Sequence, residues 1–397
     1  MRVLYLSHMK IFGGGEIFLE RLILHNPSVE SIVLLPDGSF SQRLQQNGIN
    51  VLIEKRLQPL SRENDKLWFL KLLKTPLILN NLLSIIHRTN VDLIVANSFG
   101  VVLYGAMASL LVNKKFIWIH HHPELKPKTF DFYVAPIFGR MATKIITVSN
   151  AVRNSLIRAG ISSNKVITIY NGIDCDNLFN PNLYEIGYLR KQYSISQNTL
   201  LVGLIGKISW GKGFHIAVKA IRILKEMGVD QKKFICFFIG GVSDESIQDQ
   251  RYYKEELERE IKASRLDGQI LFTGKILTNM APVYKDLDIV LNCSIEQETL
   301  GLTICEGMAM EKLVIASNIG GIPEVIDDGI NGFLVPPDDS IALAKILRDT
   351  IENYGSYKHI RKKAREQAKN KFSNEKMISQ YNELYQGIIE KHVIRRR

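Results

Sequence analysis

The chain has 397 residues, of which 46% are hydrophobic and 23% are charged. This length allows two or three domains, and the composition is that of a soluble globular protein with sizeable cores. The net charge of +11 is uneven, at +8 for residues 1–180, −4 for residues 181–350 and +7 for residues 351–397. The basic excess therefore lies at both ends of the chain, but no recognisable module supports nucleic-acid binding.

The cysteines and the start of the chain indicate a cytoplasmic protein. The run Met1–Leu6 is typical of a core strand, because it is too short for a signal peptide and no cleavage site follows it. The apolar stretch of residues 67–86 is interrupted by Lys74 and Pro76, so it does not form a membrane span. The cysteines form no C-x-x-C pair, and we expect buried free thiols in a reducing compartment. They are Cys175, Cys236, Cys293 and Cys305.

Short apolar runs alternate with segments of helical period in the first half of the chain. Helices are expected between most of these runs, for example at Glu16–Leu24 and Val101–Leu111. Strand–helix alternation of this kind predicts a doubly wound parallel sheet. The expected strands are Val3–Ser7, Ser31–Leu35, Leu93–Ala96, Lys115–Ile119, Lys144–Val148 and Val166–Tyr170.

A second alternation follows the turn signal Asn171-Gly172-Ile173-Asp174 and residues 175–198, which lack periodicity and are typical of a crossing linker. The fold class that we predict is α/β, with two Rossmann-like doubly wound parallel-sheet domains facing across a cleft. Ligands of such sheets bind outside the carboxyl ends of the strands, so we expect the site in the cleft. The expected strands are Leu200–Ile205, Phe234–Ile239, Ile270–Phe272, Ile289–Asn292, Val314–Ala316 and Gly332–Val335, with helices from about Ile341 to Glu390.

The first loop that is a candidate for ligand binding is Gly13-Gly14-Gly15-Glu16, which opens a helix after the first expected strand. Adjacent glycines let a substrate approach the backbone closely, and a helix N-terminus attracts anions. The run is not a G-x-G-x-x-G fingerprint, and a plain flexible turn is an equal alternative.

Three consecutive histidines, His120, His121 and His122, stand at the carboxyl end of the fourth expected strand. Adjacent side chains in an extended segment point alternately apart, and no partner Cys or Asp stands at zinc spacing. One histidine that reaches into the cleft is therefore favoured over a metal site.

The run from Gly206 to Gly213 follows the first strand of the second half and nearly matches a P-loop. Gly213 stands where a P-loop has the hydroxyl residue that holds Mg²⁺. A flexible loop that carries Lys207 and Lys212 before a helix suits a diphosphate held without a metal. The alternative is that both lysines are only solvated.

Two D-x-D triplets, Asp174-Cys175-Asp176 and Asp286-Leu287-Asp288, have the pattern that elsewhere holds a metal on a nucleotide-sugar. Neither has the glycine-rich or basic neighbours of a phosphate site, so we interpret both as structural. The glycine-rich turn Ser317–Glu324 also lies between a strand and a helix and would line the same crevice.

The most informative stretch runs from Asn292 to Glu306. Apolar residues at spacings of three and four predict a helix after Gly301, with Glu298 in the loop before it and Glu306 inside it. The backbone N–H groups of Thr299, Leu300 and Gly301 would favour anionic oxygens. Two carboxylates about 10 Å apart suit the two ends of one elongated ligand, although two surface glutamates on a solvated helix are the simpler alternative.

Taken together, these loops resemble the retaining nucleotide-sugar glycosyltransferases of glycosyltransferase family 4, which have the two-Rossmann GT-B fold. The most specific part is Glu298-x7-Glu306, followed by Gly307-Met308-Ala309 and by Gly320-Gly321-Ile322-Pro323-Glu324. The runs Gly14-Gly15-Glu16, Asn171–Asp174 and Gly206–Gly213 fall in the family's order, so the resemblance covers nearly the whole chain.

The resemblance implies a UDP- or GDP-type sugar donor, whose nucleotide end would be bound by Glu306 through the ribose diol. Lys207 and Lys212 would neutralise the diphosphate, together with the amides that precede the helix. Glu298 would bind the hydroxyls of the transferred sugar. Glu298, His120 and Lys212 are the expected catalytic residues, with neither a metal nor another cofactor.

The resemblance also implies roles for residues of the first domain. His120 would lie beside the reacting carbon of the sugar, and the turn at Gly14 and Gly15 would approach the phosphates or the acceptor. Lys207 stands where many members have Arg, which keeps the charge but removes a bidentate fork. Leu300 replaces the usual aromatic residue, and Gly307 replaces the common Ala at about 1 kcal/mol in a helix interior.

The resemblance implies an acceptor domain at residues 1–175, a donor domain at 176–375 and a helix at 376–397 that returns to the first domain. The expected activity is hexosyl transfer to a glycan or lipid-linked acceptor, in the synthesis of cell-surface polysaccharide or glycolipid. The basic charge and the aromatic residues Phe130, Phe132, Tyr133 and Phe138, which follow Lys126 and Lys128, suggest docking on the anionic inner face of the membrane. A solubilising charge excess with buried aromatics is the alternative.

Other functions remain open. An epimerase or phosphorylase could share this architecture, but the sequence offers neither an epimerase acid–base set nor a pyridoxal-binding lysine pocket. A non-catalytic nucleotide-sugar-binding protein would be expected to lack Glu298, Glu306 or Lys212, and all three are present.

Overall fold

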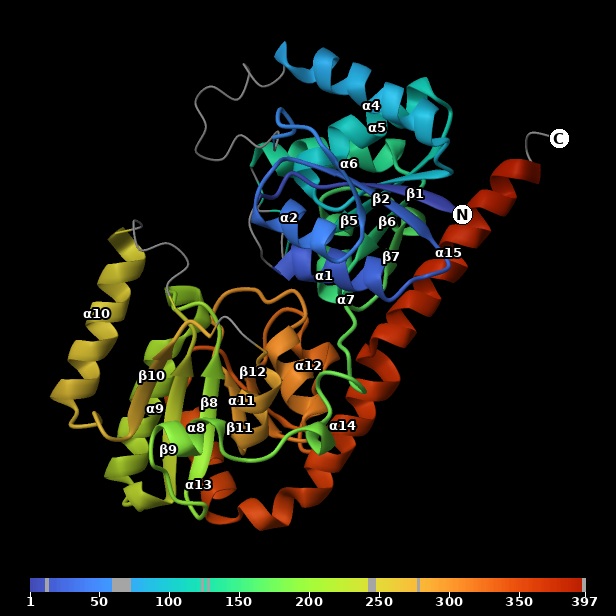
Figure 1. The fold of residues 1–397 in the computed structure, drawn as a ribbon. Helices are drawn as coiled ribbons and strands as arrows, with labels where there is room; N and C mark the ends of the chain where they lie inside the picture. The colour runs from blue at the N-terminus through green and yellow to red at the C-terminus, as the bar shows by residue number, and fades with distance from the viewer. Residues whose placement is uncertain are drawn as a thin grey trace. The chain divides into compact units, whose positions relative to one another are not determined.

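The computed structural model (Figure 1) describes residues 1–10, 14–58, 73–122, 125, 127, 129–241, 248–276 and 279–394. The chain forms two compact units. Unit 1 comprises Met1–Gly172 and Asn374–Arg397, and unit 2 comprises Ile173–Ser373. Gly13, the first residue of the predicted glycine-rich loop, lies outside the described residues.

Unit 1 is built on a seven-stranded parallel sheet of order β3-β2-β1-β4-β5-β6-β7. Its strands are β1 (Arg2–Leu6), β2 (Glu30–Leu35), β3 (Asn50–Ile53), β4 (Leu93–Ala96), β5 (Lys115–His120), β6 (Lys144–Thr147) and β7 (Val166–Thr168). Its helices are α1 (Gly14–Leu24), α2 (Ser39–Gln46), α4 (Thr75–Thr89), α5 (Val102–Leu111), α6 (Phe130–Met141), α7 (Asn150–Arg158) and α15 (Asn374–Ile394), with 3₁₀ turns at Phe99–Val101 and Ser163–Lys165.

The apolar strands of unit 1 are buried on both faces, as parallel strands between two helix layers must be. Leu4 and Leu6 of β1 belong to one core cluster, and Val3 and Tyr5 to the other. Edge strand β3 was missed in the sequence, because Asn50–Ile53 is only partly buried and its apolar signal is correspondingly short.

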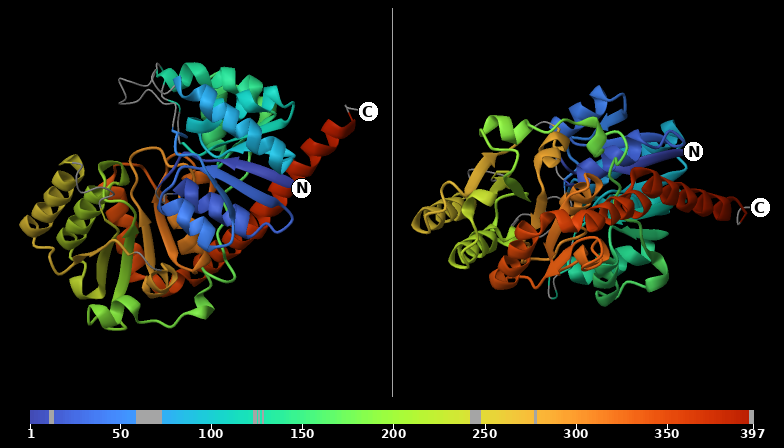
Figure 2. Two further views of the ribbon diagram at one scale, coloured as in Figure 1. Left: turned by 45° about the horizontal axis from the view of Figure 1, so that its top comes forward. Right: turned by 90° about the horizontal axis from the view of Figure 1, so that it is seen from below.

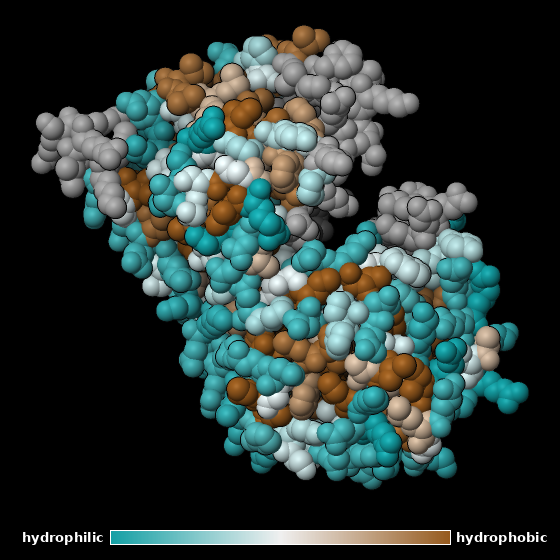
Figure 3. All heavy atoms as spheres, turned by 180° about the vertical axis from the view of Figure 1, so that it is seen from behind, coloured by the Kyte–Doolittle hydropathy of each residue, from teal (hydrophilic) through white to brown (hydrophobic). Residues whose placement is uncertain are grey.

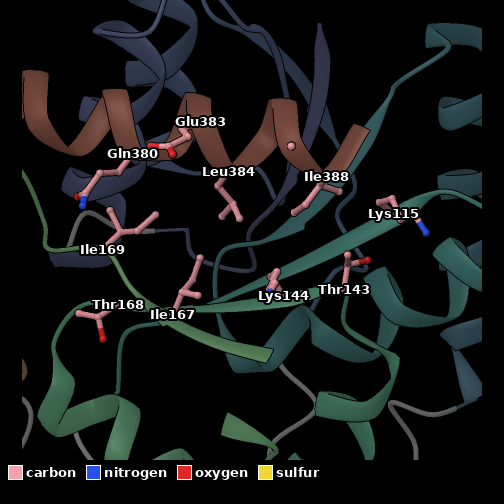
Figure 4. Close-up of a pocket in the computed structure, with 11 residues that line it drawn as sticks. Lys115, Thr143, Lys144, Ile167, Thr168, Ile169, Gln380, Glu383, Leu384 and Ile388 are labelled. Carbon is pink, nitrogen blue, oxygen red and sulfur yellow. The ribbon is translucent and has the colours of Figure 1, made fainter. Parts of the chain in front are cut away.

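Helix α15 packs on unit 1 although it lies at the other end of the chain. Tyr381 and Tyr385 are fully buried in the cluster that contains Tyr5, and the Tyr385 hydroxyl lies 3.4 Å from that of Tyr5. A groove of about 610 Å³ remains between α15 and strands β5–β7, and Figure 4 shows Leu384 and Ile388 pointing from the helix toward the strands.

Unit 2 is built on a six-stranded parallel sheet of order β10-β9-β8-β11-β12-β13. Its strands are β8 (Leu200–Ile205), β9 (Phe234–Ile239), β10 (Ile270–Gly274), β11 (Ile289–Asn292), β12 (Leu313–Ser317) and β13 (Phe333–Val335). Its helices are α8 (Tyr188–Gln192), α9 (Phe214–Glu226), α10 (Gln248–Ala263), α11 (Ala281–Asp286), α12 (Leu302–Ala309), α13 (Ser340–Glu352) and α14 (Lys358–Phe372). Its 3₁₀ turns are Pro181–Leu183, Trp210–Lys212 (η4), Gln231–Lys233, Ile322–Glu324 and Tyr354–Tyr357.

The prediction of a crossing linker at residues 175–198 was wrong, because this segment folds into unit 2. It contains α8, whose N-terminus is capped by the buried carboxylate of Asp286. That carboxylate accepts hydrogen bonds from the backbone N–H groups of Gly187, Leu189 and Arg190 at 2.5, 2.6 and 3.0 Å. This helix of five residues is too short to show a helical period in the sequence, and a side chain almost a hundred residues away satisfies its free amides.

The predicted α/β fold class with two doubly wound parallel sheets is confirmed. Strand order reverses between β1 and β4 in unit 1 and between β8 and β11 in unit 2. Such switch points open a crevice at the carboxyl ends of the two strands, where ligands of these folds bind. The loops after β1, β4, β8 and β11 are therefore where side-chain chemistry is expected.

Candidate functional site

In unit 2, the loops that follow the two switch-point strands are joined by an ion pair. Lys212, which ends η4 after β8, donates a hydrogen bond from Nζ to Oε1 of Glu298, in the loop after β11. The Ser294 hydroxyl lies 3.0 Å from the same Oε1 atom, and Ser294 is itself buried. Two predicted site residues 86 positions apart thus meet at the carboxyl ends of adjacent strands.

Backbone contacts hold these loops close together. The N–H of Ile295 donates to the carbonyl of Gly211 at 2.9 Å, and the N–H of Gly321 donates to the carbonyl of Glu298 at 2.9 Å. The ion pair therefore lies on a frame built from three loops, which follow β8, β11 and β12.

Two glycines are required by this close approach. Gly213 has φ +67° and Gly320 has φ +60°, and a Cβ atom on either would overlap a carbonyl oxygen, that of Cys293 or Glu298 respectively. The glycine at the position of the P-loop hydroxyl residue is thus explained by packing. A serine or threonine side chain does not fit there.

Free donors surround the pair. Lys207 is exposed on the same loop as Lys212. Within the described residues, no hydrogen bond engages the backbone N–H groups of Thr299, Leu300 and Gly301, which precede α12. Exposed ammonium groups and unengaged amides at a helix N-terminus form an environment that favours anionic oxygens.

Glu306 lies in the second turn of α12, as predicted, and its carboxylate is positioned by a tyrosine. The hydroxyl of Tyr284, on α11, lies 3.0 Å from Oε2 of Glu306 and 3.1 Å from the carbonyl oxygen of Thr303. Tyr284 is fully buried. Ser294 and Tyr284 were both missed in the sequence; Ser294 carries a weak signal, as a polar residue just after a buried strand.

In unit 1, the switch-point loops hold a second polar group. The Nε2 atom of His121 lies 3.0 Å from Oδ1 of Asn97, and Nδ2 of Asn97 donates to the carbonyl of Gly15 at 3.2 Å. The ring of His121 also packs edge-on against Phe18 with 4.8 Å between centroids. His121, Asn97 after β4 and Gly15 in the first turn of α1 are therefore brought together, and Asn97 is the member that was missed in the sequence.

The histidines differ in burial. His120 is only 1% exposed, its ring packs edge-on against Trp118 with 5.1 Å between centroids, and neither ring nitrogen has a partner among the described residues. His121 is partly exposed beside Gly15. Strand alternation turns the His120 side chain toward Trp118, and its place beside the reacting carbon stays a prediction.

Burial also sets the protonation of these imidazoles. It lowers the pKa of His121 to about 3, with a further contribution from His122. Burial, and then the neighbouring His122 and His121, hold the pKa of His120 well below its usual range. Both rings are therefore neutral near pH 7.

The two D-x-D triplets are occupied by structural contacts. In the first, Oδ1 of Asp174 accepts hydrogen bonds from the N–H groups of Asp176 and Asn177 at 3.3 and 2.8 Å, and Asp176 pairs with Lys369 at 2.7 Å. In the second, Asp286 caps α8 and Asp288 pairs with buried Arg190 at 3.2 Å. Among the described residues, no group of three or more His, Cys, Asp or Glu side chains has metal-binding geometry.

The cysteines are buried free thiols, as predicted. Burial raises the pKa of the Cys293 thiol to about 12, so this thiol beside the Gly213 contact is not a nucleophile.

Comparisons with known proteins agree with this geometry. The family model for Glycosyltransferase Family 4 matches residues 13–177, and the model for Glycosyl transferases group 1 matches residues 187–367. An uncharacterised glycosyltransferase of Methanocaldococcus jannaschii is 23% identical over 77% of each chain. The capsular polysaccharide biosynthesis glycosyltransferase CapM of Staphylococcus aureus is 23% identical over 64% of this chain and 66% of its own.

A solved structure is similar over nearly the whole chain. HepE from Anabaena, in a complex with UDP, is 26% identical, with a TM-score of 0.82 over 98% of this chain and 100% of its own. HepE has also been solved with UDP-glucose. The predicted family is thereby confirmed: the chain belongs to the family 4 (group 1) glycosyltransferases of the GT-B fold.

Proposed function

We propose that the chain transfers a hexosyl group from a UDP- or GDP-type donor to a glycan or lipid-linked acceptor, with retention of anomeric configuration. The observation that carries the proposal is the Lys212–Glu298 pair at the switch point of unit 2. A cation for a diphosphate and a carboxylate for sugar hydroxyls stand side by side there. The UDP and UDP-glucose complexes of HepE support a uridine nucleotide-sugar as the first donor to test.

The residues of unit 2 divide the donor between them. Lys207 and Lys212 neutralise the diphosphate, and the free amides of Thr299, Leu300 and Gly301 donate to its oxygens. When the donor binds, Lys212 exchanges its contact with Glu298 for a phosphate oxygen. The carboxylate that is released then accepts hydrogen bonds from the sugar.

The nucleoside end of the donor is assigned to Glu306. A carboxylate can accept hydrogen bonds from both hydroxyls of a ribose, and the Tyr284 hydroxyl fixes one of its oxygens in place. The ribose does not react, so this contact contributes to donor affinity rather than to the chemical step.

The reaction that we propose proceeds on one face of the sugar. The bond from the anomeric carbon to the β-phosphate oxygen breaks, the bond to the acceptor oxygen forms, and the acceptor proton passes to the departing phosphate. The transition state resembles an oxocarbenium ion. Lysine ammonium groups and amides preorganised around the leaving diphosphate lower the barrier, because negative charge develops there.

We also propose that this chemistry requires no metal. Two lysines supply positive charge where other nucleotide-sugar enzymes use a metal ion. Both D-x-D triplets are engaged in capping, turn and ion-pair contacts, so using either as a metal ligand would break a structural contact.

Unit 1 is proposed to contact the acceptor. Its switch point presents Gly15 at the start of α1, Asn97 and the partly exposed ring of His121. A neutral imidazole beside an amide offers hydrogen bonds to acceptor or sugar hydroxyls. Among the three histidines, His121 is better placed for this role than the enclosed His120.

The charge distribution supports docking of unit 1 on an anionic membrane. Unit 1 has 25 basic and 13 acidic residues, a net +12, and unit 2 has 26 and 27, a net −1. The basic stretch of residues 351–397 does not join unit 1 as a whole, because most of its cations lie on α14 in unit 2. Unit 1 is strongly basic without them.

The apolar part of this surface also differs from the expectation. Of the four aromatic residues of α6, only Tyr133 is exposed, while Phe132 and Phe138 pack against the core; Lys126 and Lys128 lie outside the described residues. Ile137 on α6 is exposed as well.

On the face shown in Figure 3, apolar side chains reach the surface in several places between hydrophilic ones. No helix in the described part of the chain is long and apolar enough to cross a bilayer.

Two experiments test these proposals. Release of UDP or GDP from a panel of nucleotide-sugars, with membrane extract as acceptor source, identifies the donor, and the anomeric proton coupling of the product reports retention. Absence of release with every UDP and GDP donor would overturn the proposed activity. Co-sedimentation with vesicles of phosphatidylglycerol tests docking: we expect binding at low salt and release at high salt, and no binding at low salt would exclude it.

A further inference from the structure

Unit 2 has a hollow of about 340 Å³ that neither Lys212 nor Glu298 lines. Its walls come from η4, α9 and α10, and the two longer helices lie side by side in Figures 1 and 2. This volume is at the lower end of the range for small-molecule sites. The hollow plays no part in the donor contacts proposed above.

An exposed tryptophan forms one wall and stacks on a buried histidine. Trp210 is 57% exposed, and its ring stacks on that of His215 with 4.1 Å between centroids and 16° between planes. His215 is buried, and its Nδ1 atom lies 2.8 Å from the Tyr253 hydroxyl. Because the indole already has a stacking partner, a ligand that packs on its exposed part needs to restrict this side chain less on binding.

The polar groups at this hollow are of both signs and largely unengaged. Lys219 and Arg259 oppose Glu256 and Glu260, so the formal charge of the lining is zero. Among the described residues, no hydrogen bond or ion pair engages the side chains of Lys219, Glu256 and Glu260. A zero sum disfavours nucleotides and other polyanions, whereas donors and acceptors beside an aromatic face suit a neutral polyhydroxylated ligand.

We propose that this hollow is a glycan-binding subsite, in which one sugar ring of a neutral oligosaccharide packs its C–H face on Trp210. The ring hydroxyls donate to Glu256 and Glu260 and accept from Lys219. This proposal rests on the proposed function in one respect, namely that a glycosyltransferase encounters glycan chains. Binding here requires neither a donor nor turnover, so the subsite would hold an acceptor or product chain on the enzyme.

The test is isothermal titration of the full-length protein with maltohexaose, cellohexaose and isomaltohexaose. We expect saturable binding of at least one, weakened about tenfold or more in Trp210→Ala, since an aromatic anchor dominates small interfaces. The double variant Glu256→Gln and Glu260→Gln should also bind more weakly. Tyr188→Ala removes another exposed aromatic residue of unit 2 that does not line the hollow, and it should bind like the wild type.

The outcomes separate this subsite from the donor site. Binding that persists at saturating UDP and in Lys212→Ala supports the subsite even if the donor assignment fails. No heat with any of the three oligosaccharides, or equal affinity in Trp210→Ala, would overturn it. Circular dichroism of each variant establishes that a loss of binding is not a loss of fold.

Discussion

Replacement of Lys212 by alanine should separate catalysis from stability. The ammonium pairs with Glu298, but the Lys212 side chain is 38% exposed, so the pair should contribute at most about 1 kcal/mol to the free energy of unfolding. In the transition state the same ammonium stabilises charge on the leaving diphosphate, and loss of such a donor costs about 3 kcal/mol. We therefore expect kcat/KM to fall about a hundredfold or more, with little change in urea stability.

The assay is the initial rate of nucleoside diphosphate release, measured beside urea unfolding of each variant. Lys233→Ala is the matched control, because Lys233 is an exposed lysine at the opposite end of the sheet, just before β9. The charge-swapped double variant Lys212→Glu with Glu298→Lys should keep an ion pair but stay inactive. Restored activity in the swap, or a loss of less than tenfold in Lys212→Ala, would refute a direct role on the diphosphate.

Three further predictions follow from the same structure. Glu306→Ala should weaken donor binding with a smaller effect on kcat, as measured by calorimetry and steady-state rates; unchanged donor affinity would refute its assignment to the ribose. Transfer should continue in EDTA, and its abolition by EDTA with rescue by Mn²⁺ would show that a D-x-D triplet binds metal. In the unfolded chain, histidines take up protons below about pH 6.5, whereas in the fold the enclosed ring of His120 and the half-buried ring of His121 stay neutral. The free energy of unfolding should therefore fall as the pH drops from 6.5 to about 3, at up to about 1.4 kcal/mol per pH unit for each histidine. Urea unfolding across this window should show a shallower fall in His120→Leu, and an unchanged slope would contradict the burial argument.

Much of the fold could be predicted because parallel strands buried on both faces appear as continuous apolar runs. Strand Leu200–Ile205, for example, has the predicted bounds. Strand β3 and helix α8 could not be predicted in this way, since a half-exposed edge strand lacks such a run and α8 depends on distant Asp286 for its N-terminal cap. Interactions over such distances leave no local pattern.

The candidate site shows the same division. Lys212 and Glu298 could be proposed from loop composition, but their mutual contact depends on strand order, which brings β8 beside β11. The sequence could not show which histidine faces the core and which faces Gly15. That depends on where β5 ends, at His120, and on the alternation of side chains along the strand. The supporting residues Ser294, Tyr284 and Asn97 carry no motif and are defined by geometry alone.

Hydrogen–deuterium exchange of the full-length protein with and without UDP, in the presence of EDTA, tests the central claim most directly. If unit 2 holds the donor at its switch point, UDP should slow amide exchange in residues 206–213 and 296–306, because bound phosphates and ribose engage the amides and order these loops. Lys212→Ala should lose this protection at the same UDP concentration. Protection confined to unit 1, or no protection at saturating UDP, would contradict the assignment.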